Sequence, residues 1–309
     1  MNVPANPMSV WVSQVMGYPV DVPIPASADD LIADRGNYRF LHLNVGLPES
    51  VELHEGVVLR DGPRPLTAEI YSPRGAADLP VLLFVHGGGW YKGSAEDERK
   101  LGMQLAEAGF VVVSVDYALA PEHPFPAGLN DVVEAARWIA DRDNIAPFGG
   151  DPDRIGLSGA SAGANLAAAA TAVIAAEGNQ PPIGALVLLY GIIDLTPVAA
   201  IPGPNPVYES YLGEDWRNRI SDPRVSPVNA DLSAFPPTYV CCGDQDRALG
   251  FSLRMIGALA AAGTAVTASV VAGANHVFLN IPDVIPGAAP ELHRITTWLQ
   301  SELASVRVG

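Results

Sequence analysis

The chain has 309 residues, 49% of them hydrophobic and 17% charged, and its 34 acidic and 18 basic side chains give a net charge of −16. This composition is typical of a folded globular protein and excludes a disordered chain. The negative charge argues against nucleic acid or an anionic membrane surface as a partner. The length suits one large α/β domain or two small ones.

Cysteine content and targeting signals bear on where the protein works. Cys241 and Cys242 are adjacent in an apolar run, and neighbours on a strand point to opposite faces, so we expect no disulfide framework. We find no basic segment followed by an apolar core near residue 1, and no stretch near the roughly 20 apolar residues that a membrane-spanning helix needs. These features predict a cytoplasmic protein.

Residues 1–45 differ from the rest because they are rich in proline and carry scattered aromatic side chains. Short helices are predicted near Ser9–Met16 and Ala28–Arg35. Apolar residues from Trp11 to Met16 recur at helical spacing, which favours burial over a flexible tail. We expect an N-terminal cap segment that covers another part of the molecule.

Residues 46–309 predict a single domain that opens with a hairpin and continues with strands alternating with helices. The hairpin strands are expected at Val51–Leu59 and Leu66–Tyr71, around the turn Arg60-Asp61-Gly62-Pro63. The later strands are continuous apolar runs, at Val81–Val85, Phe110–Val115, Ile155–Ser158, Ala185–Tyr190, Thr238–Cys242 and Val266–Val271. The helices are expected at Glu98–Ala108, Gly128–Asp141, 162–177, Ala248–Ala262 and Glu291–Leu303. Apolar strands need cover on both faces, so the predicted fold is α/β, with a mostly parallel central sheet and helices on both sides.

One connection, between Tyr190 and Thr238, is too long for a simple loop. It contains several prolines, followed by Tyr208, Tyr211 and Trp216. We expect residues 195–230 to form a cap insertion together with the N-terminal segment.

The turn Gly159-Ala160-Ser161-Ala162-Gly163 lies between a predicted strand and a predicted helix, which is the pattern of a nucleophile elbow. A strained turn would lift the serine hydroxyl above the sheet, and side chains two positions before and after it would collide with the neighbouring strand and helix. The positive end of the following helix would face a developing oxyanion.

A second glycine-rich turn, His86-Gly87-Gly88-Gly89-Trp90, follows the strand Val81–Val85. Glycines at a strand end let the backbone approach a ligand with free N–H groups, as an oxyanion hole requires. A phosphate loop is the alternative, but the turn lacks the Lys-Ser/Thr pair and is not followed at once by a helix.

A nucleophilic serine needs a base and an orienting acid, and the elbow predicts the chain order serine, acid, histidine. His293 lies in the last amphipathic helix and is interpreted as a surface or packing residue, whereas His276 lies in a loop beyond a strand's carboxyl end. The acid is Asp244 or Asp246 in the preceding loop, and position alone does not separate them. The remaining aspartate would cap the helix or turn the loop.

These motifs occur together in a characteristic order: HGGGW at 86–90, YALAPEHPFPA at Tyr117–Ala127, GASAGANLA at 159–167, then the aspartate and histidine. From about residue 58 to 298 the chain resembles the hormone-sensitive-lipase-like branch (bacterial family IV) of the α/β-hydrolases. The resemblance implies Ser161 as nucleophile, His276 as base and the N–H groups of Gly88, Gly89 and Ala162 as oxyanion donors. By the family's spacing from Pro237-Thr238-Tyr239 to Gly263, it favours Asp246 over Asp244.

The chain departs from the family pattern in a few places. The residue before the nucleophile is commonly acidic in the family and is Ala160 here, which leaves the support of the HGGG loop open. Ala164 replaces a usual glycine, and Asp246 is followed by Arg247-Ala248 instead of Pro-Leu. We interpret Glu122 and Asp131 as turn and helix-surface residues without a catalytic role, and Asp151-Pro152-Asp153 as a turn instead of a calcium loop.

The predicted function is that of a serine carboxylesterase acting on small-molecule esters of short acyl chains, with no metal and no cofactor. Alternatives are hydrolysis of another acyl bond (an aryl amide or formamide, a lactone, an acetylated small molecule) or, with less support, ligand binding without catalysis. No nucleic acid or membrane partner is expected, and a homodimer is left open. The predicted substrate-lining residues are the aromatics around the serine: Trp90, Tyr190, Tyr208, Tyr211, Trp216 and Phe278.

Overall fold

A computed structural model of the protein describes residues 27–35, 43–178, 180–200, 202–203, 205–282 and 285–304. The predicted helix near Ser9–Met16, with Trp11 and Met16, lies outside these residues. The second predicted helix of the N-terminal segment is confirmed as α2 (Ala28–Asp34), which Ser27 caps by accepting a hydrogen bond from the Asp30 N–H.

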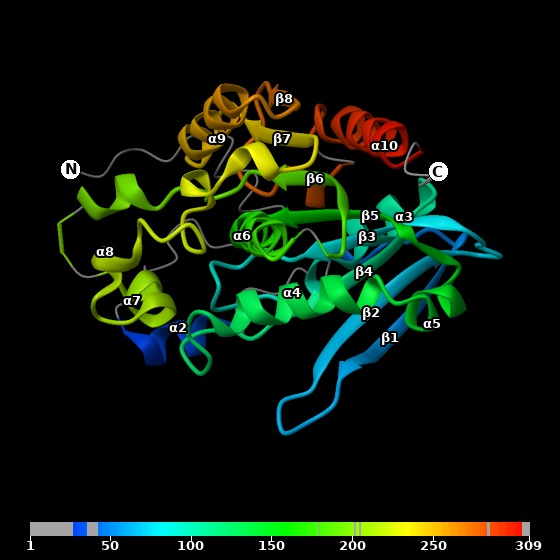
Figure 1. The fold of residues 1–309 in the computed structure, drawn as a ribbon, viewed down its shortest axis with the longest axis horizontal. Helices are drawn as coiled ribbons and strands as arrows, with labels where there is room; N and C mark the ends of the chain where they lie inside the picture. Colours follow the sequence, from blue (N-terminus) through cyan, green and yellow to red (C-terminus); the bar gives the residue numbers. More distant parts are fainter. Residues whose placement is uncertain are drawn as a thin grey trace.

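The described strands form one eight-stranded sheet with the order β1-β2-β4-β3-β5-β6-β7-β8 (Figure 1). Its strands are β1 (Val51–Arg60), β2 (Leu66–Pro73), β3 (Leu79–Val85), β4 (Val111–Asp116), β5 (Gly150–Ala160), β6 (Ile183–Leu189), β7 (Thr238–Gly243) and β8 (Val266–Val271). β2 pairs antiparallel with β1 and β4, and the other neighbouring strands are parallel. The predicted fold class is therefore confirmed.

Helices cover both faces of this sheet (Figure 1). One apolar layer contains buried residues of α4 (Ala127–Ile139), α6 (Ala162–Ala176) and α9 (Leu249–Ala262), and the other contains those of α3 (Arg99–Glu107) and α10 (Ala288–Ala304). Side chains of β3 alternate between the two layers, with Leu83 in the first and Phe84 in the second. This alternation explains why each central strand is apolar along its whole length.

Two details of the elements differ from the prediction. β5 begins at Gly150, because the Asp151-Pro152-Asp153 segment forms a bulge inside the strand, where the register shifts between Pro80 and Val81 of β3. The helix α5 (Arg142–Ile145) was not predicted; it is only 4 residues long and begins at the capping residue Asp141.

Short helices lie in the long connection between β6 and β7. They are α7 (Pro206–Leu212) and α8 (Trp216–Arg219), and α2 packs against α7 although the two are far apart in sequence (Figure 1). Among the helices of the described residues, none is long and apolar enough to span a bilayer.

Candidate active site

Ser161 stands between the end of β5 and the start of α6 with a backbone φ of 55° and ψ of −115°, a conformation that L side chains rarely adopt. A Cβ atom on Gly159 would lie 2.3 Å from the Gly163 carbonyl oxygen, and one on Gly163 would lie 2.0 Å from the Val85 carbonyl oxygen. Both flanking positions therefore exclude any larger residue, for the steric reason that the sequence predicts.

The structure brings Ser161, His276 and Asp246 together in one hydrogen-bonded chain. The Ser161 Oγ lies 2.9 Å from His276 Nε2, and His276 Nδ1 lies 2.8 Å from Asp246 Oδ2. An ionised carboxylate only accepts, so Nδ1 carries the proton and Nε2 is left to accept from the serine hydroxyl. The three residues come from the carboxyl ends of β5, β7 and β8, which meet at one edge of the sheet.

The two aspartates of the loop after β7 have different partners. Asp246 is buried, and its second oxygen, Oδ1, accepts the Ala248 N–H at 2.7 Å, so this one residue both holds the histidine and fixes the start of α9. Burial alone would raise the pKa of Asp246, but His276 and the Ala248 N–H hold it below the usual value. Asp244 instead accepts the Gly273 N–H at 2.8 Å and ties its loop to the loop that carries His276.

The glycine-rich turn after β3 lies beside the serine. The Gly88 carbonyl accepts the N–H groups of Tyr91 and Lys92, whereas within the described chain no backbone carbonyl accepts from Gly88 or Gly89. A Cβ on Gly88 would lie 2.0 Å from the Lys92 carbonyl oxygen, so the turn requires glycine there. The Ser161 N–H is bonded to a β6 carbonyl, which leaves Ala162, the first residue of α6, as the N–H beside the hydroxyl.

The predicted substrate-lining aromatics fall into two groups. Trp90 stacks on Tyr211 with ring centroids 4.8 Å apart, and Tyr208 lies between Trp90 and Trp216, at 6.0 and 5.3 Å. This aromatic cluster of 90, 208, 211 and 216 joins the glycine-rich turn at 86–90 to α7 and α8. Tyr190 and Phe278 are instead fully buried behind the imidazole, with Tyr190 5.3 Å from the His276 ring.

Comparison with known proteins agrees with this geometry. The family model for the α/β-hydrolase fold matches residues 82–280. The chain is 33% identical to carboxylesterase NlhH of Mycobacterium tuberculosis over 279 residues, which cover 85% of this chain and 86% of that protein. The chain belongs to the α/β-hydrolase family. Within that family it is a member of the hormone-sensitive-lipase-like branch, bacterial family IV.

Solved structures of esterases share the whole architecture. An esterase of Pyrobaculum calidifontis superposes with a TM-score of 0.80 at 28% identity, covering 96% of this chain and 99% of the other. EstE1, a thermophilic carboxylesterase cloned from a metagenomic library, superposes with a TM-score of 0.78 at 29% identity, covering 91% and 99%. The likeness extends over nearly the full chain.

Asp131 corrects one interpretation of the sequence. It lies on α4 but is fully buried, and is not a helix-surface residue. Its carboxylate binds Arg60 at 3.0 Å and Arg64 at 2.6 Å, and it accepts the Ala118 N–H at 2.8 Å. Asp131 thereby fixes the segment that begins at Tyr117, whose ring stacks on His86 at 4.2 Å. Its two arginine partners lie 71 and 67 positions earlier in the chain, so helical periodicity gave no indication of them.

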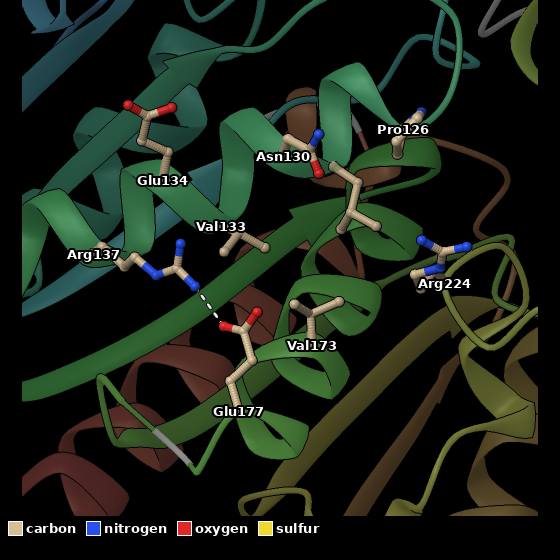
Figure 2. Close-up of a pocket in the computed structure, with 9 residues that line it drawn as sticks. Pro126, Asn130, Val133, Glu134, Arg137, Val173, Glu177 and Arg224 are labelled. Carbon is tan, nitrogen blue, oxygen red and sulfur yellow. Dashed lines mark hydrogen bonds and ion pairs between the residues drawn. The ribbon is translucent and has the colours of Figure 1, made fainter.

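A surface hollow lies between α4 and α6 (Figure 2). It has a volume of about 680 Å³, and its lining includes Val133, Val173 and the ion pair of Arg137 with Glu177. None of the predicted site residues lines this hollow. Within the described residues no group of three or more His, Cys, Asp or Glu side chains is arranged to hold a metal ion.

Two features near the site were not predicted. Arg35, which follows α2, donates to the carbonyl oxygens of Tyr91 and Ala120 and pairs with Glu122. Asp34 accepts from Lys92 at 2.7 Å and from the Tyr91 hydroxyl at 3.0 Å. The only sequence signal for Asp34 and Arg35 is their place in the expected cap segment.

The second feature that was not predicted is the burial of Glu98, which the sequence places at the start of a helix.

Left-handed backbone conformations gather at the same edge of the sheet. The described residues include five non-glycine positions with positive φ. Four of them follow strands at the edge of the sheet where Ser161 and His276 meet: Trp90, Ser161, Tyr190 and Val277. The fifth, Asp78, precedes β3 and so lies toward the opposite edge. The site is thus built on strained backbone at several positions.

Proposed function

We propose that this protein is a serine carboxylesterase that hydrolyses esters of short acyl chains through an acyl-enzyme on Ser161. The observation that carries the proposal is the continuous chain of two hydrogen bonds, 2.9 and 2.8 Å long, from Ser161 through His276 to Asp246. Serine is a weak nucleophile unless a base removes its proton, and this arrangement supplies both the base and the group that orients it.

In the proposed mechanism, His276 Nε2 takes the proton of the Ser161 hydroxyl as the oxygen attacks the ester carbonyl. Asp246 holds the imidazole in the required tautomer and stabilises its positive charge. His276 then gives the proton to the leaving alcohol. Water attacks the acyl-enzyme by the reverse sequence and releases the acid. No step requires a group other than those of the chain, the ester and water.

The tetrahedral oxyanion is proposed to bind the N–H groups of Gly88, Gly89 and Ala162. The support is their lack of backbone acceptors and the position of Ala162 at the first turn of α6, where the helix dipole is positive. Donors that are fixed before the reaction act most strongly on charge that develops only in the transition state.

Residues 1–45 and 195–230 are proposed to form the cap that limits acyl length. The support is the packing of α2 on α7 and the aromatic cluster 90/208/211/216 beside the oxyanion turn. Each methylene that fits contributes about 0.8 kcal/mol. A longer chain must displace packed rings, which costs about 1–3 kcal/mol or more. We therefore expect acyl groups from acetyl to about hexanoyl.

The proposal is tested with a series of p-nitrophenyl esters and a fluorophosphonate probe. Turnover should be highest for short acyl chains, and mass spectrometry should find the phosphonate on Ser161, with Ser161→Ala unlabelled. Labelling of another serine would contradict the assignment, and faster turnover of emulsified long-chain triglycerides than of butyrate esters would contradict the capped pocket. Aryl amides and lactones in the same assay test the alternative acyl bonds.

A further inference from the structure

Glu98 is a buried carboxyl group that the mechanism above does not use. It lies at the end of the 3₁₀ helix η3 (Glu96–Glu98), directly before α3, and is 3% exposed. Its Oε1 accepts the Gly87 N–H at 3.0 Å, and within the described residues its Oε2 has no hydrogen-bond partner. Gly87 is the residue before the two proposed oxyanion donors.

The contacts of Gly87 show how close this carboxyl lies to the elbow. A Cβ atom built on Gly87 would lie 3.2 Å from Glu98 Oε1, 3.2 Å from the Ala160 carbonyl oxygen and 3.5 Å from Ser161 Cβ. The carboxyl group, the residue before the nucleophile and the nucleophile therefore surround the same backbone unit. Position 160 is commonly acidic in the family and is alanine here. Glu98 of η3 places a carboxyl group near Ala160 instead.

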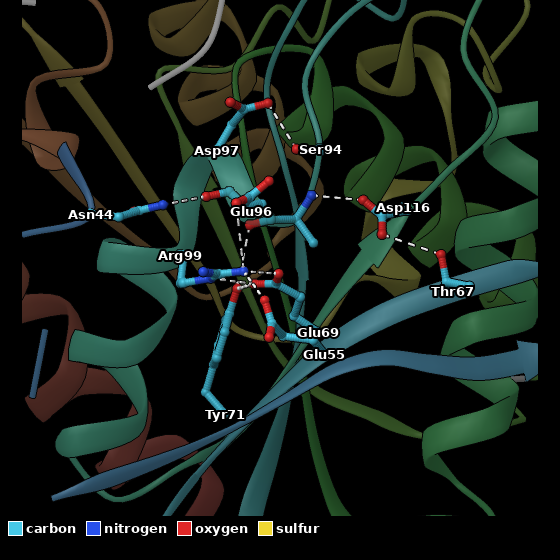
Figure 3. Close-up of polar contacts among 11 residues, drawn as sticks. Asn44, Glu55, Thr67, Glu69, Tyr71, Ser94, Glu96, Asp97, Arg99 and Asp116 are labelled. Carbon is cyan, nitrogen blue, oxygen red and sulfur yellow. Dashed lines mark hydrogen bonds and ion pairs between the residues drawn. The ribbon is translucent and has the colours of Figure 1, made fainter. Parts of the chain in front are cut away.

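The segment that carries Glu98 is fixed on several sides (Figure 3). The Ala95 N–H donates to Asp116 at 2.8 Å, and Ser94 donates to Asp97 at 2.8 Å. Arg99, the next residue, pairs with the buried Glu69 of β2. These contacts hold η3 against β2 and β4, so Glu98 approaches the glycine turn from a segment that is anchored by several polar contacts.

Burial dominates the electrostatics around Glu98. Three groups shift the pKa of Glu98: Asp97 of the same element, the Gly87 N–H after β3 and the Asn280 side chain of η8 (Phe278–Asn280). Burial and, after it, Glu98 in turn raise the pKa of the Tyr117 and Tyr190 hydroxyls. Within the described chain no lysine, arginine or histidine forms an ion pair with Glu98. Burial, together with Asp97, raises its pKa to about 7 against the opposing effects of the Gly87 N–H and Asn280.

We propose that Glu98 is a positioning residue that holds the oxyanion turn through Gly87 and does so best as a neutral carboxylic acid. The proposal rests on the proposed esterase function. A neutral carboxyl still accepts the Gly87 N–H, so the N–H groups of Gly88 and Gly89 stay fixed. An ionised carboxylate would put a negative charge beneath the place where the oxyanion develops, which disfavours the transition state.

Glu98→Ala and Glu98→Gln separate positioning from charge. Glu98→Ala removes the acceptor and should lower kcat by on the order of 10- to 100-fold with KM nearly unchanged, because the oxyanion contacts form only in the transition state. Glu98→Gln keeps an acceptor and should retain most of the activity at pH 6. Glu96→Gln, on the same short helix but part-exposed, is the matched control and should behave as the wild type.

The pH dependence provides a readout that a merely structural role would not move. The ratio of kcat for Glu98→Gln to kcat for the wild type should rise as the pH goes from 6 to 8.5, since only the wild type then acquires the buried charge. Using this ratio cancels the titration of groups that both proteins share. A flat ratio, or a Glu98→Gln variant as inactive as Glu98→Ala, would overturn the neutral-acid form of the proposal, and full activity of Glu98→Ala would overturn the positioning role.

Thermal unfolding decides the question independently of turnover. The pKa of Glu98 is higher in the folded protein than in the unfolded chain, so its contribution to stability is fully present below about pH 4.5 and is lost as the pH rises through about 7. The Tm of Glu98→Gln relative to wild type should therefore increase by several degrees between pH 5 and 8.5. If the wild type neither turned over esters nor took up the phosphonate, the proposed esterase function would be wrong. The Tm difference would still report whether Glu98 titrates beneath the turn. A Tm difference that did not change with pH would show that Glu98 does not titrate in this range.

Discussion

Ser161 and His276 share one hydrogen bond, and each is of little use to the proposed reaction without the other. We expect Ser161→Ala and His276→Ala each to lower kcat by on the order of 10⁴-fold or more. The double variant should lose little beyond either single variant, because the two side chains act as one unit. Steady-state kinetics with p-nitrophenyl butyrate measures all three. Losses that add up on a logarithmic scale would show that the two residues act separately.

Asp246 and Asp244 have different hydrogen-bond partners, so we expect their substitutions to have different effects. Asp246→Asn should lower kcat by on the order of 10⁴-fold, because an amide opposite His276 Nδ1 favours the wrong tautomer. Asp244→Asn should leave kcat within a few-fold and lower the Tm instead, since its partner is the Gly273 N–H of a neighbouring loop. Kinetics and thermal unfolding of both variants check this division. The reverse pattern would transfer the orienting role to Asp244.

Among single residues, the sequence predicts those whose role follows from their spacing along the chain. Gly159 and Gly163 flank the serine at fixed positions, and their steric role follows from the turn. Asp131 and Glu98 could not be predicted in the same way, because what defines them is burial and contact with Arg60, Arg64 and Gly87 from other elements. Helical spacing says which face a residue occupies but not which distant strand meets that face.

Asp34 and Arg35, at the end of α2, connect the proposed cap to the proposed oxyanion turn. Asp34 binds Lys92 and Tyr91 just after the turn, and Arg35 holds the carbonyl oxygens of Tyr91 and Ala120. Removing residues 1–40 deletes both anchors and exposes the apolar surface beneath α2. We expect kcat/KM for butyrate esters to fall, binding of a hydrophobic dye to rise, and the triad to remain assembled.

A point variant isolates this anchor from the rest of the segment. Arg35→Ala should lower kcat/KM for short esters several-fold, whereas Arg142→Ala, which breaks an exposed ion pair with Asp153, should have no effect on kinetics. Ester kinetics and Tm measurements on the two variants provide the comparison. If the truncated protein and Arg35→Ala both matched the wild type, the N-terminal segment would have no part in the site.

The elements themselves were predicted closely wherever an apolar run needed cover on both faces, as in β3, β4, β6 and β7. The first part of β5 was missed because Asp151 and Asp153 form a polar bulge, and a strand with a bulge loses the apolar pattern that identifies it. The length and aromatic content of the connection between β6 and β7 support the proposal of a cap insertion, but the stacking of its rings on Trp90 could not be predicted from them.

For the molecule as a whole, we expect four left-handed positions at the proposed catalytic edge to limit its heat resistance: Trp90, Ser161, Tyr190 and Val277. Each left-handed residue costs roughly 1–3 kcal/mol, and the net stability of a folded protein is only about 5–15 kcal/mol. Val277→Gly should therefore raise the Tm by a few degrees and lower kcat, because the neighbouring His276 gains freedom; a lower Tm would show that the site carries no strain there. Substitutions that raise thermal stability without lowering turnover should therefore lie at the opposite edge of the sheet and on the outer helices. The four left-handed positions should stay unchanged.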